Sequence, residues 1–410
     1  MNIDVDKSSG WMPDEGKLDA EQNHILDVLA DWIENSRGKN ICHLIRGFAG
    51  SGKTILLIYA MIQTIKRKPN AKVCLVTYTY ALRDLVVSGL EGETPPIYTI
   101  QNFLNELDQG ENKQTKKFDF MFVDEVQDLR EKNLELFKNN ADGIVVAGDP
   151  DQSIYKWGTH VEKIKEILEI NESRCHKLEI LYRLPPKVVE IANTILRDTE
   201  MIHAYNGWVG EQGQVSTTRY ENIVQEAETV FYFANKLAEP RRPSLILLPF
   251  HEDIHNFATQ ICSSIKVGPP PKKQKYRTDE GWQTNYDEFN KHLQNAGLNL
   301  MFFGSNNGDL EISQHQPQTY LMTYHSAKGL DFSHVFLPGL NFGSDICKKK
   351  SPGDEAIEKT LLFVGLTRTK KDLFISFNSE TEHELLEGIV RITGITDFES
   401  PTENGGDMPF

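Results

Sequence analysis

Eight residues near the N-terminus, 47–54 with the sequence GFAGSGKT, constrain this chain more than any other segment. Glycines in this pattern let the backbone N–H groups turn inward around phosphate oxygens, the lysine reaches β- and γ-phosphates, and the threonine hydroxyl ligates Mg²⁺. The loop follows a short apolar run at 41–45 and precedes an apolar helical segment at 55–65, which is the strand–loop–helix order that such a loop requires. The pattern predicts a nucleoside triphosphate site whose residues are Gly47, Gly50, Ser51, Gly52, Lys53 and Thr54. The alternative is a Gly/Ser turn that happens to contain Lys-Thr.

Two adjacent carboxylates follow a second apolar run. Residues 118–123 (FDFMFV) predict a buried parallel strand that ends at Asp124 and Glu125. At the carboxyl end of a strand, Asp124 can hold Mg²⁺ through its water shell while Glu125 polarises the attacking water. Acidic turns after strands are common, so this interpretation depends on the phosphate loop.

Further segments follow one another in a recognisable order. They read LDAEQ (18–22), LVTYTYALRDLV (75–86), YTIQNF (98–103), VDEVQDL (123–129), VAGDPDQSIYKWG (146–158), LYRL (181–184), TYHSAKGLDF (323–332) and EKTLLFVGLTRTKK (358–371). This order resembles the superfamily 1 helicases of the UvrD/Rep type from about residue 18 to residue 376. The resemblance implies an ATP- and Mg²⁺-dependent motor that moves on nucleic acid.

The resemblance also implies roles for individual residues. Lys53, Asp124, Glu125, Gln152, Arg183 and Arg368 would act on the phosphates, with Thr54 and Asp124 at Mg²⁺ and the two arginines completing the site from the other half of the chain. Gln22 and Tyr182 would hold the adenine, and Gly329 and Asp331 would lie near the nucleotide. The residues implied at the nucleic acid are Tyr78, Thr99, Tyr155, Trp157, Thr323 and His325. Core packing is the alternative for each aromatic residue, and it fits Tyr78 better than Trp157.

Several positions depart from the family pattern. Asp331 is one methylene shorter than the usual ribose-binding Glu, and Tyr80 replaces an amide. Tyr78 replaces a Phe but keeps a ring that can stack on a base. Gly158 stands where an arginine is usual, and Leu181 stands where an asparagine is usual. These changes affect strand grip and nucleotide fit more than the phosphate chemistry.

Apolar strand-like runs alternate with amphipathic helical segments along the chain, which predicts an α/β fold with parallel sheets. With the resemblance, this gives two RecA-like P-loop domains, at 1–172 and 173–397, and an acidic flexible tail at 398–410. The second half is expected to begin with a strand at 176–181. Only 89–98 and about 264–284 remain for the inserted subdomains of full-sized relatives, so both inserts are expected to be absent or reduced to loops.

Composition adds one argument against nucleic acid. The 410 residues carry a formal net charge of −15, which repels a polyanion unless basic groups gather locally. Local basic groups occur at 66–68, 266–277, 348–350 and 370–371, and each alone is more typical of a solvated loop. The five scattered cysteines and the lack of a long apolar run or signal segment favour a cytoplasmic protein with no membrane partner.

Three functions fit the sequence to different degrees. The first is an ATP-dependent translocase or helicase that moves 3′ to 5′ on single-stranded nucleic acid, with DNA favoured over RNA. The second is an ATP-driven regulatory switch that partners a nuclease in DNA repair or antiviral defence, which the acidic composition and reduced inserts favour. The third is a generic P-loop enzyme such as a small-molecule kinase, and Gln152, Arg183 and Arg368 in their motifs argue against it.

Overall fold

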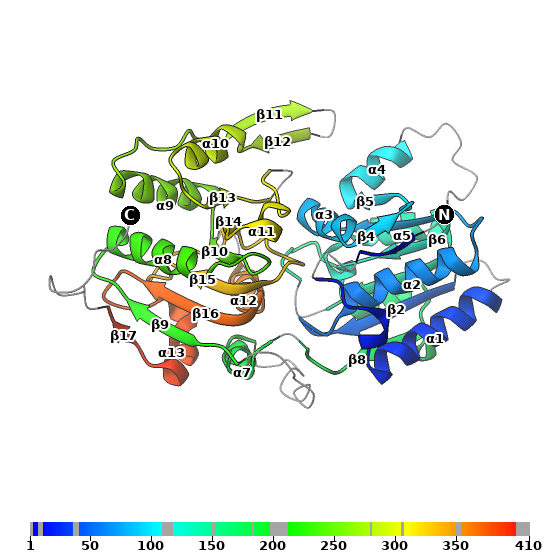
Figure 1. Cartoon of the computed structure of the whole chain (residues 1–410). Helices are drawn as coiled ribbons and strands as arrows, with labels where there is room; N and C mark the ends of the chain where they lie inside the picture. The colour runs from blue at the N-terminus through cyan, green and yellow to red at the C-terminus, as the bar shows by residue number, and fades with distance from the viewer. Residues whose placement is uncertain are drawn as a thin grey trace. The chain divides into compact units, whose positions relative to one another are not determined.

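A computed structural model describes residues 3–6, 11–35, 41–108, 118–149, 153–182, 184–196, 212–278, 281–304, 307–348 and 354–398. The chain divides into two compact units (Figure 1). Unit 1 comprises residues 1–183 and two short later segments, and unit 2 comprises the rest.

Unit 1 is built on a parallel sheet of six strands in the order β5-β3-β6-β7-β2-β8. The strands are β2 (Ile41–Gly47), β3 (Val73–Thr77), β5 (Ile97–Thr99), β6 (Phe118–Val123), β7 (Ala141–Gly148) and β8 (Cys175–Leu178). Every residue of β3 is buried, as expected of a parallel strand covered on both faces.

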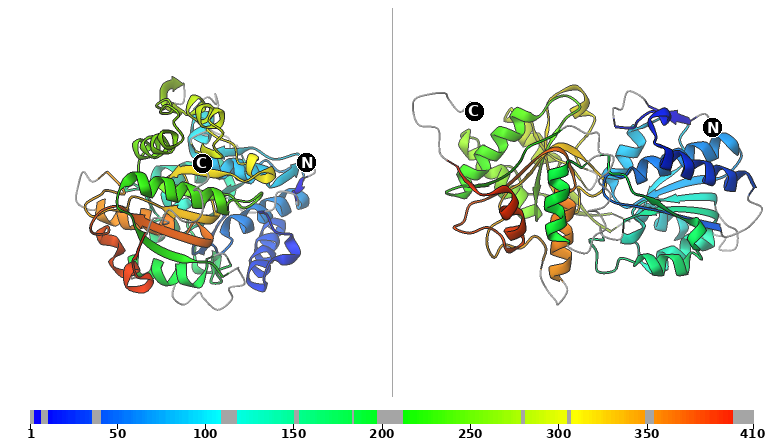
Figure 2. Two further views of the ribbon diagram at one scale, coloured as in Figure 1. Left: turned by 60° about the vertical axis from the view of Figure 1, so that its left-hand side comes forward. Right: turned by 90° about the horizontal axis from the view of Figure 1, so that it is seen from below.

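Helices cover both faces of this sheet (Figure 2). Side chains of α1 (Ala20–Asn35), α2 (Lys53–Arg67) and α3 (Tyr80–Ser88) share one core with Ile45 and Leu75. Side chains of α4 (Ile100–Asp108), α5 (Glu131–Asn140) and α6 (Val161–Ile167) share the other core with Leu44 and Val76. Neighbouring residues of one strand thus enter opposite cores, which is the period-two alternation of a sheet. A short antiparallel pair, β1 (Ile3–Val5) with β4 (Leu90–Gly92), adds to the α2 side.

The strand at the edge of this sheet differs from the sequence expectation. β8 pairs with β2, so Leu44 lies opposite Cys175 and Gly47 opposite Leu178. The sequence assigned this segment to the start of the second half because a new series of α/β elements begins there. Its hydrogen bonds place it in the sheet of unit 1.

Unit 2 contains a second parallel sheet, with seven strands in the order β13-β14-β10-β15-β16-β9-β17. The strands are β9 (Val215–Arg219), β10 (Ser244–Leu248), β13 (Leu300–Phe302), β14 (Thr319–Thr323), β15 (Phe332–Leu337), β16 (Thr369–Phe377) and β17 (Thr396–Asp397). One face is covered by α8 (Ile223–Leu237), α9 (His251–Ser264) and α10 (Asp287–Asn295). The remaining helices are α7 (Pro186–Ile195), α11 (Ile312–His315), α12 (Asp354–Leu366) and α13 (Glu387–Thr393).

The predicted fold class is confirmed, because each unit is a parallel sheet flanked by helices. Sequence patterns missed β9, whose residues VSTTR are polar, and the hairpin of β11 (Gln274–Thr278) and β12 (Gly281–Asn285), where a mobile loop was expected. The predicted tail at 398–410 lies outside the described residues except for Phe398. No helix within the described ranges is long and apolar enough to cross a membrane.

A buried histidine connects the first helix to the edge strand in unit 1. His43 of β2 is 3% exposed, and its ring lies 4.6 Å from Trp32 of α1 and 5.3 Å from His176 of β8, measured between centroids. The two imidazoles are stacked, with His43 Nδ1 and His176 Nε2 3.0 Å apart. Burial, followed by the charges of His176 and Arg174, lowers the pKa of His43 to about 3.

This pKa predicts that acid destabilises unit 1. Between pH 6.5 and about 3 the unfolded chain binds a proton at His43 that the folded protein excludes, so the free energy of unfolding falls as the pH falls through this window. From pH 7 to pH 5, wild type should lose about 2 kcal/mol more than His43→Phe, which keeps a stacked ring. Urea unfolding followed by tryptophan fluorescence measures the difference. Equal pH dependence of the two proteins would contradict the assignment.

Candidate functional site

One row of residues crosses the whole sheet of unit 1. Tyr98, Val76, Val123, Val146, Leu44 and Cys175 are successive partners across the six strands. Because all strands run the same way, the segments that follow them meet at one edge of the sheet. This edge therefore collects the phosphate loop, the two carboxylates and the segments around Tyr78 and Asp149.

The phosphate loop connects β2 to α2 through two left-handed glycines. Gly50 has φ of 80° and Gly52 has φ of 85°, a region that side-chain-bearing residues rarely adopt. Lys53 begins α2, and its Nζ donates hydrogen bonds to the carbonyl oxygens of Gly47 at 2.7 Å and Phe48 at 2.9 Å. The ammonium group is thus held over the loop by the loop's own backbone.

The magnesium-ligand candidates are in direct contact. Thr54 Oγ1 donates to Asp124 Oδ2 at 2.6 Å, and Asp124 is 2% exposed. Burial, with a further contribution from the charge of Glu125, raises the pKa of Asp124 to about 6, whereas Thr54 and Lys53 oppose the rise. A hydroxyl and a carboxylate oxygen are ligands that Mg²⁺ prefers, and the cation would add positive charge beside the two buried carboxylates.

Glu125 is held in an unusual backbone conformation. Its φ of 53° lies in the left-handed region, and its N–H donates to Asp124 Oδ1 at 2.9 Å. Glu125 is buried, and its Oε2 accepts a hydrogen bond from Gln127 Nε2 at 2.5 Å. The turn therefore directs the two carboxylates differently, one to Thr54 and one to Gln127.

Gln127 joins the carboxylate turn to the segment after β7, a role that sequence analysis did not assign. Its Oε1 accepts from the backbone N–H of Asp149 at 3.2 Å, and its carbonyl accepts from the N–H of Thr159 at 3.0 Å and from Ser153 Oγ at 3.4 Å. An added Cβ on Gly148 would lie 2.5 Å from Gln127 Oε1, so only glycine fits there. The motif VDEVQDL contains this residue, but spacing alone does not show what an amide contacts.

The two adenine candidates lie beside the phosphate loop. Gln22 is 5% exposed, and its Nε2 donates to the carbonyl of Ser51 at 3.3 Å. The backbone N–H of Tyr182 donates to the carbonyl of Gly50 at 3.1 Å. The structure thus brings together residues that are 160 positions apart in the chain, and both are tied to the loop through its carbonyl groups.

Three of the predicted nucleic-acid residues form an aromatic row at the same edge. Ring centroids of Tyr78 and Tyr155 are 5.0 Å apart, and those of Tyr155 and Trp157 are 4.7 Å apart and stacked. Arg130 lies over Trp157 at 5.0 Å, and Trp157 is 46% exposed. Burial raises the pKa of Tyr78 to about 12.

Thr99, another residue predicted at the nucleic acid, is not exposed like Trp157. It is buried, and its Oγ1 accepts a hydrogen bond from the N–H of Asn102 in the first turn of α4.

The candidates in unit 2 lie around the ends of β14 and α12. Thr323 Oγ1 and Ser326 Oγ are 2.7 Å apart, and His325 is half-buried with a lowered pKa that burial explains, with a smaller effect from Lys328. Gly329 has φ of 83°, and Asp331 directly precedes β15.

Arg368 is almost completely buried within unit 2. It is 2% exposed, and its guanidinium donates to the carbonyls of Val364 at 3.0 Å and Leu330 at 3.1 Å and to Thr367 Oγ1 at 3.2 Å. Gln152 and Arg183, the other predicted γ-phosphate residues, lie outside the described residues.

Two models of known protein families match parts of the chain. A model described as an AAA domain matches residues 33–157, and one described as a UvrD-like helicase C-terminal domain matches residues 279–380. The chain belongs to the superfamily 1 helicases of the UvrD/Rep type.

Curated relatives of this UvrD/Rep-type chain match it over limited segments. DNA helicase II of Haemophilus influenzae is 42% identical over 72 residues, which cover 17% of this chain and 10% of that protein. ATP-dependent DNA helicase PcrA of Staphylococcus epidermidis is 26% identical over 140 residues, which cover 33% of this chain and 19% of that protein. The matched segments thus span a fifth or less of these relatives. A solved structure of an arterivirus nonstructural protein 10 helicase aligns with 89% of this chain and 64% of its own, at a TM-score of 0.39 and 14% identity.

In this UvrD/Rep-type chain, the buried hydrogen bonds of Arg368 predict that its replacement lowers the stability of the fold. Arg368→Ala removes the guanidinium that donates to two carbonyls and a hydroxyl, so the free energy of unfolding should fall by about 3 kcal/mol. The exposed Arg391→Ala on α13 is the matched control and should change it by less than about 0.5 kcal/mol. Urea unfolding measures both. Equal stability of the two variants would show that these hydrogen bonds contribute little.

Proposed function

We propose that the protein hydrolyses ATP and uses the energy to move along single-stranded nucleic acid, with DNA favoured over RNA. The main support is the set of hydrogen bonds made by Gln127. They connect the Glu125 carboxylate to Asp149 and Ser153, in the segment that leads to Tyr155 and Trp157. In this proposal, a change at the γ-phosphate is transmitted to the residues that hold the strand.

Each residue of the phosphate site has a role in this proposal. Lys53 moves its ammonium from the loop carbonyls to the β- and γ-phosphates, and the N–H groups of the loop hold the phosphate oxygens. Thr54 and Asp124 would hold Mg²⁺, which supplies positive charge to the phosphates. Glu125 orients the attacking water and accepts its proton, while Gln127 fixes the orientation of the Glu125 carboxylate.

The aromatic row supplies the grip on the strand. Trp157 is 46% exposed, and in this proposal an unpaired base stacks on its ring, a contact worth roughly 1–3 kcal/mol per base. Tyr155 stacks on Trp157, Tyr78 packs against Tyr155, and Arg130 lies over the Trp157 ring with its positive charge. Stacking does not depend on base identity, so this row fits a motor that moves over any sequence.

Two substitutions separate binding from hydrolysis. Lys53→Ala should weaken ATP binding because it removes the cation at the phosphates, whereas Glu125→Gln should bind ATP and lower kcat by about 10²–10⁴ because the amide is a poor base. ATP hydrolysis with and without single-stranded DNA, together with titration of a fluorescent ATP analogue, measures both effects. Hydrolysis by Glu125→Gln at the wild-type rate would refute the role of this carboxylate.

The direction of movement is a separate prediction. The GDPDQSIY and HSAKGLDF segments resemble those of the branch that moves 3′ to 5′, so the motor should displace streptavidin from the 5′ end of a biotinylated oligonucleotide faster than from the 3′ end. The control is the same reaction with Glu125→Gln, which should displace neither. Faster displacement from the 3′ end would reverse the proposed polarity.

A further inference from the structure

A basic segment of unit 2 is folded against two helices next to the β11–β12 hairpin. His255 Nε2 of α9 donates to the carbonyl of Pro270 at 2.9 Å, and His292 Nε2 of α10 donates to the carbonyl of Gly268 at 2.8 Å. Figure 1 shows the hairpin beside α10, outside the sheet. These contacts fix the path of the chain that leads to Lys272, Lys273 and Lys275, a stretch that sequence analysis could not separate from a solvated loop.

His251 and Lys348, from other parts of unit 2, belong to the same basic region. His251 begins α9, and its Nδ1 lies 2.7 Å from the hydroxyl of Tyr286. Lys348, from the chain after β15, places its Nζ 5.9 Å from the ring centroid of Phe250. Lys275 and Lys348 are exposed, and Lys273 is half-buried. Lys348 therefore lies at the start of α9, although it is 73 positions from Lys275 in the sequence.

The pKa values of His251 and Lys273 are shifted in the direction that neighbouring positive charges cause. Burial, followed by the charges of Lys273, Lys275, His325 and Lys348, lowers the pKa of His251 to about 4. Burial, followed by the charges of Lys275 and Lys348, lowers the pKa of Lys273. Holding like charges together opposes folding unless an anion neutralises them.

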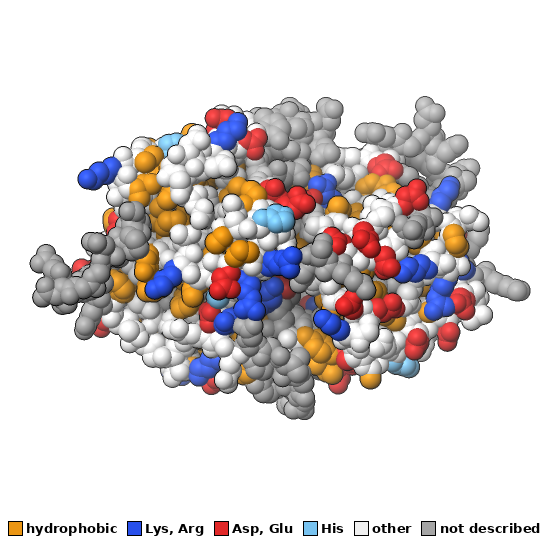
Figure 3. All heavy atoms as spheres, in the orientation of Figure 1, with side chains coloured by type: hydrophobic (Ala, Val, Ile, Leu, Met, Phe, Trp, Pro, Cys, Tyr) orange, Lys and Arg blue, Asp and Glu red, His pale blue; other side chains and the backbone are white. Residues whose placement is uncertain are grey.

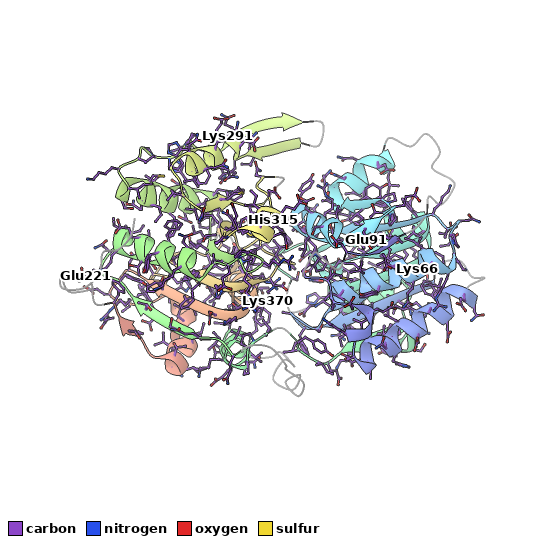
Figure 4. The ribbon with its side chains drawn as sticks, in the orientation of Figure 1. Lys66, Glu91, Glu221, Lys291, His315 and Lys370 are labelled. Carbon is purple, nitrogen blue, oxygen red and sulfur yellow. The ribbon has the colours of Figure 1, made fainter. Side chains whose placement is uncertain are left out.

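Nearby carboxylates do not neutralise this cluster. Asp253 Oδ2 accepts the backbone N–H of Phe250 at the start of α9, and Glu288 pairs with Lys291 at 3.1 Å. Within the described ranges, none of the salt bridges involves Lys273, Lys275 or Lys348. Lys291, which is labelled in Figure 4, lies on α10 beside the β11–β12 hairpin.

On α6, on α7 and over the face seen in Figure 3, basic side chains are mixed with acidic ones. Figure 3 shows both signs interspersed over the visible face, as expected for a chain of net charge −15. On α6, for example, Lys163 pairs with Glu166 at 2.9 Å, and on α7 Lys187 pairs with Glu190 at 3.1 Å. The unneutralised cluster is therefore a local exception to the charge of the whole chain, and a polyanion is the ligand that fits it.

We propose that Lys273, Lys275 and Lys348 bind the sugar–phosphate backbone of the single strand and extend the contact predicted for His325 outward along the hairpin. This inference rests on the proposed function, because it adds a second contact surface for the same strand. Lysines on a backbone supply affinity and position without reading sequence, which suits a motor that moves along any strand.

The test replaces all three lysines with glutamine and measures binding of fluorescein-labelled dT and U oligonucleotides by anisotropy over a range of salt. Removing three phosphate contacts should weaken binding at least tenfold at low salt and reduce the slope of log K against log salt by about 2 for a single strand. Lys163, Lys187 and Lys236 replaced together with glutamine are the control, since they remove the same charge elsewhere. A Lys→Arg triple variant at the cluster should restore the affinity.

The outcomes separate this inference from the proposed function. If wild type binds and the cluster variant has an unchanged affinity and salt slope, the inference is wrong and the motor function stands. Equal weakening by the control variant would also overturn it, because net charge alone would then explain the effect. If wild type binds neither oligonucleotide, both the inference and the proposed function are wrong. Thermal unfolding of each variant within a few degrees of wild type shows that loss of binding is not loss of folding.

Discussion

The parallel register of the first sheet is the constraint on which the rest of the site depends. Because β6, β7 and β2 run in one direction and pair without a shift, Val123, Val146 and Leu44 stand side by side and the chain leaves each strand at the same level. A slip of one residue would turn every side chain of a strand into the opposite core. The strand register and the two cores on either face of the sheet thus bring Asp124 within hydrogen-bond distance of Thr54.

The side-chain amide of Gln127 connects the Glu125 carboxylate to the segment after β7. A glutamine can donate and accept at the same time, and Gln127 uses its Nε2 toward Glu125 and its Oε1 toward the N–H of Asp149. A hydrogen bond to a carboxylate is worth more than one between neutral groups, so the orientation of the amide follows the state of the carboxylate. The backbone of the same residue also holds Thr159 and Ser153. Movement of the carboxylate turn would therefore shift the chain that carries Trp157.

Local sequence patterns predicted the fold class and the order of the main strands because apolar runs and glycine loops have direct structural meaning. They did not place β8, because an edge strand of four residues, CHKL, has no distinctive period and only its partner strand identifies it. Motifs named Gln22 and Tyr182 as neighbours of the nucleotide, and the structure adds how each is tied to the loop. The relay through Gln127 and the gathering of lysines around His251 depend on contacts between distant segments, which no periodicity encodes.

Glu125 shows where this chain accepts strain. A residue with a side chain in the left-handed region costs about 1 kcal/mol or more, which glycine would avoid, and burial of a second carboxylate next to Asp124 adds to the cost. The backbone conformation alone would favour glycine at this turn, whereas the hydrogen bond from Gln127 and the need for a carboxylate oppose it. Directed evolution of this protein for heat resistance, without a selection for activity, would be expected to erase its chemistry first at this position.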